Sequence, residues 1–298
     1  ISLLDDLDID LTLDHLAGVF NTNNHTVKVG TFNSSNGTKP RTLNFGSSEI
    51  LIIAYGNFTS NNVKTTVNAG TSHIKFLGFS NGFVGYDSQV FYDVTYYAQA
   101  TLYGENNLQF NRVVMLDNGT IWGDNTFKGL IFSAGKTYTL SSGSTQTIEN
   151  WTLGGTPCDV TKVLSSVAGT RANVNVTGAV TSFNFADLKD INASGQTLHF
   201  GEQSTIANQN NNNITYDAYN PGAFAALGDD WLCHEFDNSV PSSYTLSGTE
   251  FYGNNFTTYK WYKIVGENSS STTVIATTQN LDVRPFGYGT FKVHVYYS

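Results

Sequence analysis

Charged side chains, proline, cysteine and methionine are all scarce in this 298-residue sequence. Asp, Glu, Lys and Arg make up 13% of it, whereas they make up about 25% of an average soluble domain. There are 15 basic residues against 24 acidic ones, which gives a formal net charge of -9. Nucleic-acid binding requires a concentrated basic patch that neutralises phosphates, and no segment provides one. We therefore expect no nucleic-acid partner.

Long apolar runs and targeting signals are also missing. No run reaches the roughly 20 apolar residues of a membrane-spanning helix, so we expect no membrane span. The chain opens at Ile1 without a methionine, a basic segment or an apolar signal core. We interpret it as a mature or excised piece of a longer protein, with its native export signals outside this sequence.

The only cysteines are Cys158 and Cys233, which lie far apart in the sequence. Neither has a second ligand at the spacing of a metal site, so no metal centre is expected there. We favour the interpretation that both are small buried apolar groups. A disulfide between them stays open as an alternative in an oxidising compartment.

Asparagine, with 32 residues, and threonine, with 36, supply the polarity that charges do not. Asn and Gly favour turns that need left-handed backbone angles. Thr, Val, Tyr and Phe favour pleated strands. The composition therefore predicts an all-β chain with many turns.

A short phrase of glycine, an acidic residue and asparagine occurs twice, and each copy leads into an apolar run. Gly104-Glu105-Asn106 precedes Val113-Val114-Met115, and nineteen residues later Gly123-Asp124-Asn125 precedes Leu130-Ile131-Phe132. A period of about 20 residues indicates stacked coils, because one coil cannot bury its apolar side without neighbours. Such stacking would produce a long, stiff platform or spacer.

Short strand-like runs without helices between them fill residues 25–150. Their spacing of roughly 15 to 25 residues suits a parallel β-helix better than a doubly wound sheet. We therefore expect a right-handed parallel β-helix over residues 1–228, including a terminal loop and linker. Meandering strands of a β-sandwich remain the alternative.

Residues 229–298 have a different character. Strand-like segments at 244–246, 259–265, 273–276 and 291–297 alternate with turns, and Trp261 occupies a core position. This pattern predicts a small immunoglobulin-like β-sandwich module, although the usual pair of core cysteines is missing.

An alternating stretch supplies the candidate ligand-binding residues. Small or apolar side chains alternate there with a second set, which consists of Thr95, Tyr97, Gln99, Thr101 and Tyr103. If the first set faces the core, the second forms a row of rings and hydrogen-bonding groups on an open sheet, where sugars could stack. Thr95, Tyr97, Gln99 and Tyr103 are therefore the candidate binding residues. Ordinary β-propensity also places Tyr and Thr on exposed strand faces, which is the competing explanation.

An acidic row lies near the start of the chain. Asp8, Asp10 and Asp14 share the polar side of the alternating segment 7–14. Calcium is one possible ligand of such carboxylates. A solvated row that protects the edge of a sheet fits better, because side chains two apart on a strand do not wrap a cation.

The tightest acid and base group is Asp187, Lys189 and Asp190. On a strand Asp190 points away from the other two, so the three do not converge. The histidines are scattered, and no nucleophile arrangement or phosphate-binding loop is present. We therefore expect no enzyme activity, no catalytic residue, no metal site and no cofactor.

Several phrases in a fixed order carry a family resemblance. They are 37–48 (GTKPRTLNFGSS), 123–127 (GDNTF), 138–148, 158–166 and 187–195, followed by 259–262 (YKWY) and 289–295 (GTFKVHV). Over about residues 20–215 this order resembles the SprB-like surface adhesins of gliding Bacteroidota, which the type IX secretion system exports. The last two phrases resemble the immunoglobulin-like or PKD-like modules that follow in such proteins, where the position of Phe291 usually holds tyrosine.

The resemblance implies a non-catalytic fragment of a secreted adhesin at the extracellular cell surface. It would serve cell adhesion or gliding motility, contact a polysaccharide or another substratum, and have the type IX secretion and gliding machinery as partners. A β-helix polysaccharide lyase or glycoside hydrolase is the first alternative. The second is a structural stalk or secretion cargo without a ligand of its own.

Overall fold

The computed structural model describes residues 1–35, 38–53, 56–78, 81–104, 107–155, 159–178, 183–201, 204, 209–216, 245–247, 258–264, 273–282 and 290–296. The chain divides into two compact units, Ile1–Asp217 and Ala218–Ser298. The expected division after residue 228 falls outside the described residues, as do Cys158 and Cys233 and therefore their pairing. The described residues contain strands and no helix, so none of their elements is a helix that could cross a membrane.

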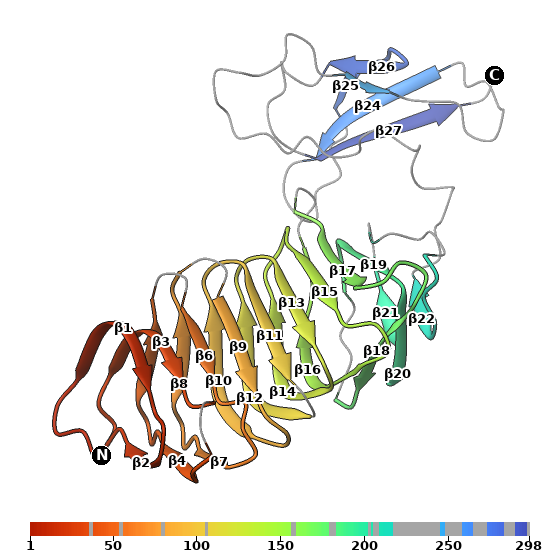
Figure 1. The fold of residues 1–298 in the computed structure, drawn as a ribbon. Coiled ribbons are helices and arrows are strands. Elements are labelled where there is room, and N and C mark those ends of the chain that lie inside the picture. Colours follow the sequence, from red (N-terminus) through yellow and green to blue (C-terminus); the bar gives the residue numbers. More distant parts are fainter. Residues whose placement is uncertain are drawn as a thin grey trace. The chain divides into compact units, whose positions relative to one another are not determined.

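The strands are short and follow one another closely (Figure 1). The first unit contains β1 Leu7–Asp14, β2 Gly18–Asn21, β3 Val27–Asn33, β4 Arg41–Asn44, β5 Glu49–Ile52, β6 Asn57–Thr59, β7 Thr65–Asn68, β8 His73–Phe76, β9 Asn81–Gly85, β10 Val90–Tyr96, β11 Ala100–Gly104, β12 Leu108–Met115, β13 Gly119–Trp122, β14 Asn125–Phe132, β15 Thr137–Leu140, β16 Thr145–Thr152, β17 Thr161–Ser165, β18 Ala172–Val176, β19 Ala186–Lys189, β20 Ile191–Gly195, β21 Leu198–Phe200 and β22 Ile214–Tyr216. The described part of the second unit contains β23 Thr245–Ser247, β24 Thr258–Ile264, β25 Val274–Ala276, β26 Asn280–Asp282 and β27 Thr290–Tyr296.

The first unit is a parallel β-solenoid of about 9 turns. Two long ladders of parallel strands form two of its sides. We name the ladder β5, β8, β10, β12, β14, β16, β18, β20 face A, and the ladder β6, β9, β11, β13, β15, β17, β19 face B. A third, three-stranded sheet, β2-β4-β7, closes the first coils. The all-β class and the parallel coils expected from the sequence are therefore confirmed.

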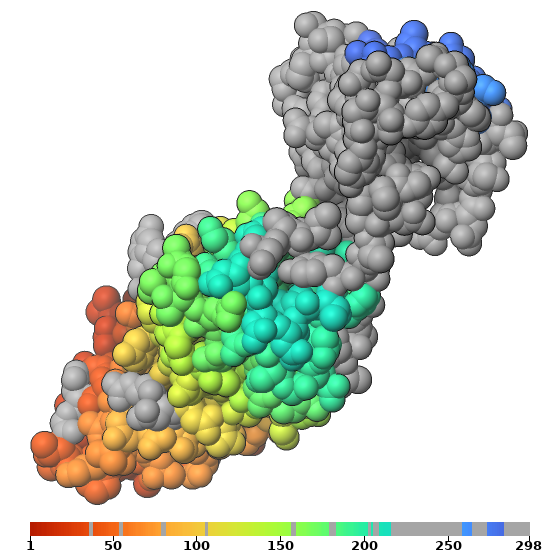
Figure 2. Space-filling view, turned by 90° about the vertical axis from the view of Figure 1, so that its right-hand side faces the viewer, coloured from red at the N-terminus to blue at the C-terminus, as the bar shows by residue number. Residues whose placement is uncertain are grey.

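Successive coils lie in register although their lengths differ. Val94 on β10 pairs with Val113, nineteen residues later, and Val113 pairs with Leu130, seventeen residues later. In Figure 2 the colours of the first unit run in sequence order from red to cyan, so consecutive coils occupy consecutive positions along its axis. Residues that are distant in sequence therefore form straight rows on its surface.

Stacked aromatic rings fill much of the interior. Phe32 stacks on Phe58 with ring centroids 4.9 Å apart, and Phe58 stacks on Phe83 at 5.2 Å. Phe110 and Phe127 form a further stack at 5.5 Å. All five are buried, and each such ring pair contributes about 0.5–1.5 kcal/mol beyond the burial of its area. These distances are near the spacing of about 4.8 Å between neighbouring strands.

The glycines of the repeated phrase stack on each other. Gly123 has a φ of +73°, and a Cβ atom placed there would lie 1.6 Å from the carbonyl oxygen of Gly104 in the preceding coil. The apolar runs that follow the two phrases also pair in register, with Val113 opposite Leu130 and Met115 opposite Phe132. The repeat in the sequence is thus a repeat of the coil.

The described part of the second unit is antiparallel. β24 lies between β25 and β27, and β23 pairs with β26. Trp261 on β24 is fully buried, as the sequence indicates, and its indole N–H donates to the carbonyl oxygen of Thr278 at 2.9 Å.

Replacing Gly123 by alanine should destabilise the solenoid strongly. The substitution combines a cost of about 1–2 kcal/mol for left-handed backbone at a residue with a Cβ with overpacking of about 1–3 kcal/mol against Gly104. Gly143→Ala is the matched control, because Gly143 has a φ of +76° but nothing within 4 Å of the added Cβ. Urea unfolding should show a clearly larger loss for Gly123→Ala. Equal losses would contradict the stacking of these glycines.

Candidate functional site

The outward residues of face B form two rows of a distinct chemical kind. Tyr103 on β11 lies opposite Trp122 on β13, and these side chains are 43% and 37% exposed. Val84 on β9 precedes them in the same row. Beside it runs a row of hydroxyl groups, because Thr101, Thr120 and Thr139 are paired in register. Figure 1 shows β9, β11, β13 and β15 side by side.

A third row follows the bend where each coil passes from face A to face B. The backbone N–H of Tyr97 donates to the carbonyl of Phe76, which precedes Leu77, and the N–H of Leu116 donates to the carbonyl of Tyr96. Leu77, Tyr97 and Leu116 therefore occupy equivalent positions on three consecutive coils. All three are exposed, Tyr97 by 49%. We call Leu77, Tyr97 and Leu116 the corner row, and with the two rows above it forms the candidate site.

The structure changes the row predicted from residues 95–103. Tyr97, Gln99 and Tyr103 are exposed, and Tyr96, Ala98 and Leu102 on the alternate positions are buried, as expected. Thr95 is not part of the site, because it lies on β10 in face A and is only 7% exposed. The strand ends at Tyr96 and the chain bends before β11 begins at Ala100, so the row is not continuous.

The other members of the site were missed by sequence reasoning: Leu77, Val84, Leu116, Thr120, Trp122 and Thr139. A signal existed for Trp122. It directly precedes Gly123, as Tyr103 precedes Gly104 and Val84 precedes Gly85. Extending the glycine phrase by one residue would have shown an outward apolar row. The corner row had no such signal, since its spacing depends on where each coil bends.

Face A carries a charged strip that differs from face B. Glu49, His73, Asp93 and Arg112 pair one after another across four coils. Arg112 Nη2 lies 2.6 Å from Asp93 Oδ2, and Asn111 Nδ2 donates to Asp93 Oδ1 at 2.9 Å. These contacts occupy both oxygens of the Asp93 carboxylate.

Lys75, which lies beside the strip, and His73 within it also contact side chains of neighbouring coils. Lys75 forms an ion pair with Glu49 of the preceding coil. His73 Nε2 lies 2.8 Å from Thr95 Oγ1. Burial lowers the pKa of His73, and the charge of Lys75 lowers it further. The strip thus links consecutive coils through paired groups.

The acid and base group at Asp187, Lys189 and Asp190 does not converge, as the sequence indicates. Asp187 and Lys189 point outward on β19. Asp190 is buried and has a φ of +59°. Its carboxylate accepts from Asn210 Nδ2 at 2.7 Å and from the Gly169 N–H at 3.0 Å, and these bonds lower the pKa of Asp190. Asp190 therefore joins neighbouring coils through its carboxylate.

The acidic row of the first strand lies at the surface. Lys28 Nζ lies 3.0 Å from Asp8 and 4.0 Å from Asp10, and Asn33 Nδ2 donates to Asp14 at 2.7 Å. These partners come from the next coil, so the carboxylates help to pair β1 with β3. Elsewhere, Asp5, Asp6 and His25 are the one group of potential metal ligands within 4.8 Å of one another in the described part of the chain. Asp5 and Asp6 are exposed, and Asp6 accepts from the Thr26 N–H.

A shallow hollow lies at the coil bend that precedes the corner row. It is lined by Asp10, Leu11, Thr12, Gly30, Thr31, Ile53 and Gly56. The glycines pack closely there, since a Cβ on Gly56 would lie 1.5 Å from the carbonyl oxygen of Gly30. Leu77 follows Ile53 on the next coil, where its N–H donates to the carbonyl of Ile52. The hollow therefore extends the corner row with apolar surface.

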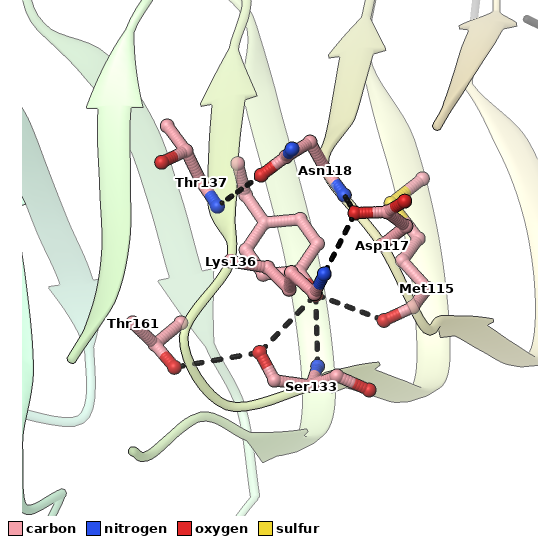
Figure 3. Close-up of polar contacts among 8 residues, drawn as sticks. Met115, Asp117, Asn118, Ser133, Lys136, Thr137 and Thr161 are labelled. Atoms are coloured by element: carbon pink, nitrogen blue, oxygen red, sulfur yellow. Dashed lines mark hydrogen bonds and ion pairs between the residues drawn. The ribbon is translucent and has the colours of Figure 1, made fainter. Parts of the chain in front are cut away.

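A buried tyrosine fixes the coils beneath the site. The Tyr138 hydroxyl donates to the carbonyl oxygen of Met115 at 2.9 Å and accepts from the Ser133 N–H at 2.8 Å. Burial raises the pKa of Tyr138 to about 12. Figure 3 shows Met115, Asp117, Asn118, Ser133, Lys136 and Thr137 gathered around this bend.

Polar contacts at the surface of the same bend join the same two coils. Lys136 forms an ion pair with Asp117 at 3.0 Å. The side chain of Asn118 accepts from the Thr137 N–H at 2.8 Å. The strands that carry Trp122 and Thr139, β13 and β15, are therefore fixed to each other.

Tyr138→Phe should lower the free energy of unfolding by about 0.5–1.5 kcal/mol, because it removes the hydrogen bonds of the buried hydroxyl while the Ser133 N–H keeps its bond of 3.1 Å to the Met115 carbonyl. The raised pKa gives this contribution a pH dependence. It is fully present below the unfolded pKa of about 10 and is lost as pH rises from there through about 12. The difference in the free energy of unfolding between the two proteins should therefore be full at pH 8 and should shrink as the pH rises from about 10 towards about 12. Tyr103→Phe, which alters an exposed ring, should change stability little at either pH.

No protein-family model, no curated protein and no solved structure matches this chain.

Proposed function

We propose that the chain is a non-catalytic fragment of a secreted, cell-surface adhesin that contacts a polysaccharide or another substratum through face B. The observation that carries this proposal is the exposure of five large apolar side chains on three consecutive coils, on face B and at the bend beside it: Leu77, Tyr97, Tyr103, Leu116 and Trp122. Large exposed apolar patches mark interaction sites. Tyr and Trp combine an apolar ring with a polar tip, which suits a ligand with both apolar and hydroxyl surfaces.

The scaffold beneath the patch supports a binding role. Stacked rings and in-register strands hold the rows rigidly, so little conformational entropy is lost when a ligand binds. A repeated row also offers equivalent contacts on successive coils, which favours a polymer over a small molecule. No cofactor is needed for such contact.

The remaining parts of the proposal rest on the family resemblance and on fold rules. The solenoid is right-handed, as nearly all parallel crossover connections are. The second unit is an immunoglobulin-like module that serves as a spacer, which is consistent with antiparallel strands around the buried Trp261. The parent protein would serve attachment or gliding motility and would be exported by the type IX secretion system.

A carbohydrate-active enzyme on the same fold is the second candidate, and the charged strip of face A favours it. Glu49 and Asp93 lie on the same row with His73 between them, two strand spacings or about 9.6 Å apart. That separation is close to the range of about 6.5–9.5 Å between the carboxyl groups of inverting glycosidases. Each carboxylate is, however, engaged by a cation, Glu49 by Lys75 and Asp93 by Arg112. The strip therefore fits coil pairing better than catalysis.

The adhesin proposal is tested by incubating the purified chain with insoluble polysaccharides and assaying both retention and released sugars. We expect retention without reducing-end or unsaturated products. The double variant Tyr103→Ala/Trp122→Ala should lose most of the retention. Val63→Ala, which shortens an apolar side chain that is 72% exposed outside the site, should not.

Product release would establish the enzyme instead. It should then disappear in Glu49→Gln or Asp93→Asn while retention stays unchanged. Absence of retention on every polysaccharide and surface tested would leave the structural stalk as the remaining function.

A further inference from the structure

We propose that face B selects uncharged polysaccharides, and that the sugar chain lies across the coils, over the threonine row and between the two apolar rows. This inference rests on the proposed function and specifies its ligand. It follows from the spacing of the three rows and from the distribution of charge around them.

The spacing favours a chain that runs along the solenoid axis. Neighbouring strands are about 4.8 Å apart, which is close to the length of one pyranose unit in an extended chain. Successive sugars would therefore meet Tyr103 and then Trp122 with the same geometry. Thr101, Thr120 and Thr139 repeat at the same interval and can exchange hydrogen bonds with the sugar hydroxyls.

The strands of the site carry no charge. The described outward positions of β9, β11, β13 and β15 are Gly82, Val84, Thr101, Tyr103, Thr120, Trp122, Thr137 and Thr139. The anionic groups of a charged polysaccharide would lose bound water on these strands without forming an ion pair, which is unfavourable. An uncharged chain has no such penalty.

Acidic residues beyond the ends of two site strands also disfavour anions. Asp87 and Asp124 are exposed two residues after the ends of β9 and β13. On β17, the next strand of face B, Lys162 is exposed opposite Thr137, whereas Lys136 at the bend is paired with Asp117. The whole chain has a net charge of -9. Like charges at a rim suppress the wrong partner and slow its approach.

The test compares retention on two neutral polymers, cellulose and chitin, with retention on beads of two anionic polymers, alginate and polygalacturonate. We expect the wild-type chain to bind at least one neutral polymer and to keep binding it at about 1 M salt, where the Debye length is only about 3 Å. Tyr103→Ala and Trp122→Ala should each weaken that binding by about tenfold.

A matched pair of lysine substitutions tests the location and the charge argument together. Thr120→Lys places a cation in the middle of the threonine row, and Thr147→Lys places one at an outward position of β16 on face A. Thr120→Lys should lose about tenfold or more of the binding to the neutral polymer and increase binding to the anionic ones. Thr147→Lys should leave neutral binding unchanged. Thermal unfolding of each variant shows whether the fold is retained.

The outcomes separate this inference from the proposed function. Preferential binding of alginate or polygalacturonate, or equal effects of the two lysine substitutions, would overturn the inference and leave the adhesin proposal intact. Self-association of the chain that Trp122→Ala abolishes, without binding to any polysaccharide, would assign face B to a second copy and overturn both.

Discussion

Hydrogen bonds between parallel coils impose a single spacing on this solenoid, and its other features follow from that spacing. Inside the coils, stacked aromatic rings match this spacing: the ring centroid of Phe58 lies 4.9 Å from that of Phe32 and 5.2 Å from that of Phe83. Outside, the same spacing turns one residue per coil into a straight row. A surface row is therefore a consequence of the core, since a change of register inside the solenoid would move every outward residue to another position.

The low content of charged residues becomes understandable in the same terms. Identical charges stacked one strand apart would repel, whereas amides and hydroxyls can pair with copies of themselves. Asn192 donates to Asn173 at 2.9 Å, and Asn212 donates to Asn192 at 2.8 Å, so three coils are joined by one ladder of amides. In the interior, the buried Gln146 accepts from Asn125 at 3.0 Å and donates to the Gly123 carbonyl at 2.7 Å. Neutral polar side chains thus form hydrogen bonds between coils without the cost of removing water from charged groups.

The two long faces use one scaffold in different ways. On face A, charged side chains share a row and pair between coils, as Asp93 does with Arg112. On face B, the rows over the central coils are apolar or carry hydroxyls, and their side chains remain exposed. Because the backbone is the same on both sides, the difference lies in the outward residues alone. This separation allows one side to stabilise the stack while the other remains available for a ligand.

Much of the fold could be predicted from the sequence because coil formation leaves local signals. The glycine phrase marks equivalent turns, since only glycine fits where Gly123 approaches Gly104. Alternation correctly separated buried Tyr96 and Leu102 from exposed Tyr97 and Tyr103. The abundance of turn-forming Asn and Gly and of strand-forming Thr, Val, Tyr and Phe indicated the all-β class.

The site itself depended on the tertiary structure. Alternation continues through residues 94–103, but the chain bends between Tyr96 and Ala100. Thr95 therefore lies on face A, where its hydroxyl contacts His73. The bend cannot be located from the pattern of apolar residues, because a bend and a strand can share the same alternation. The alignment of Tyr97 with Leu77 and Leu116, and of Tyr103 with Trp122, requires the register between coils of unequal length. Backbone pairing over the whole solenoid sets that register, and no single segment of the chain contains it.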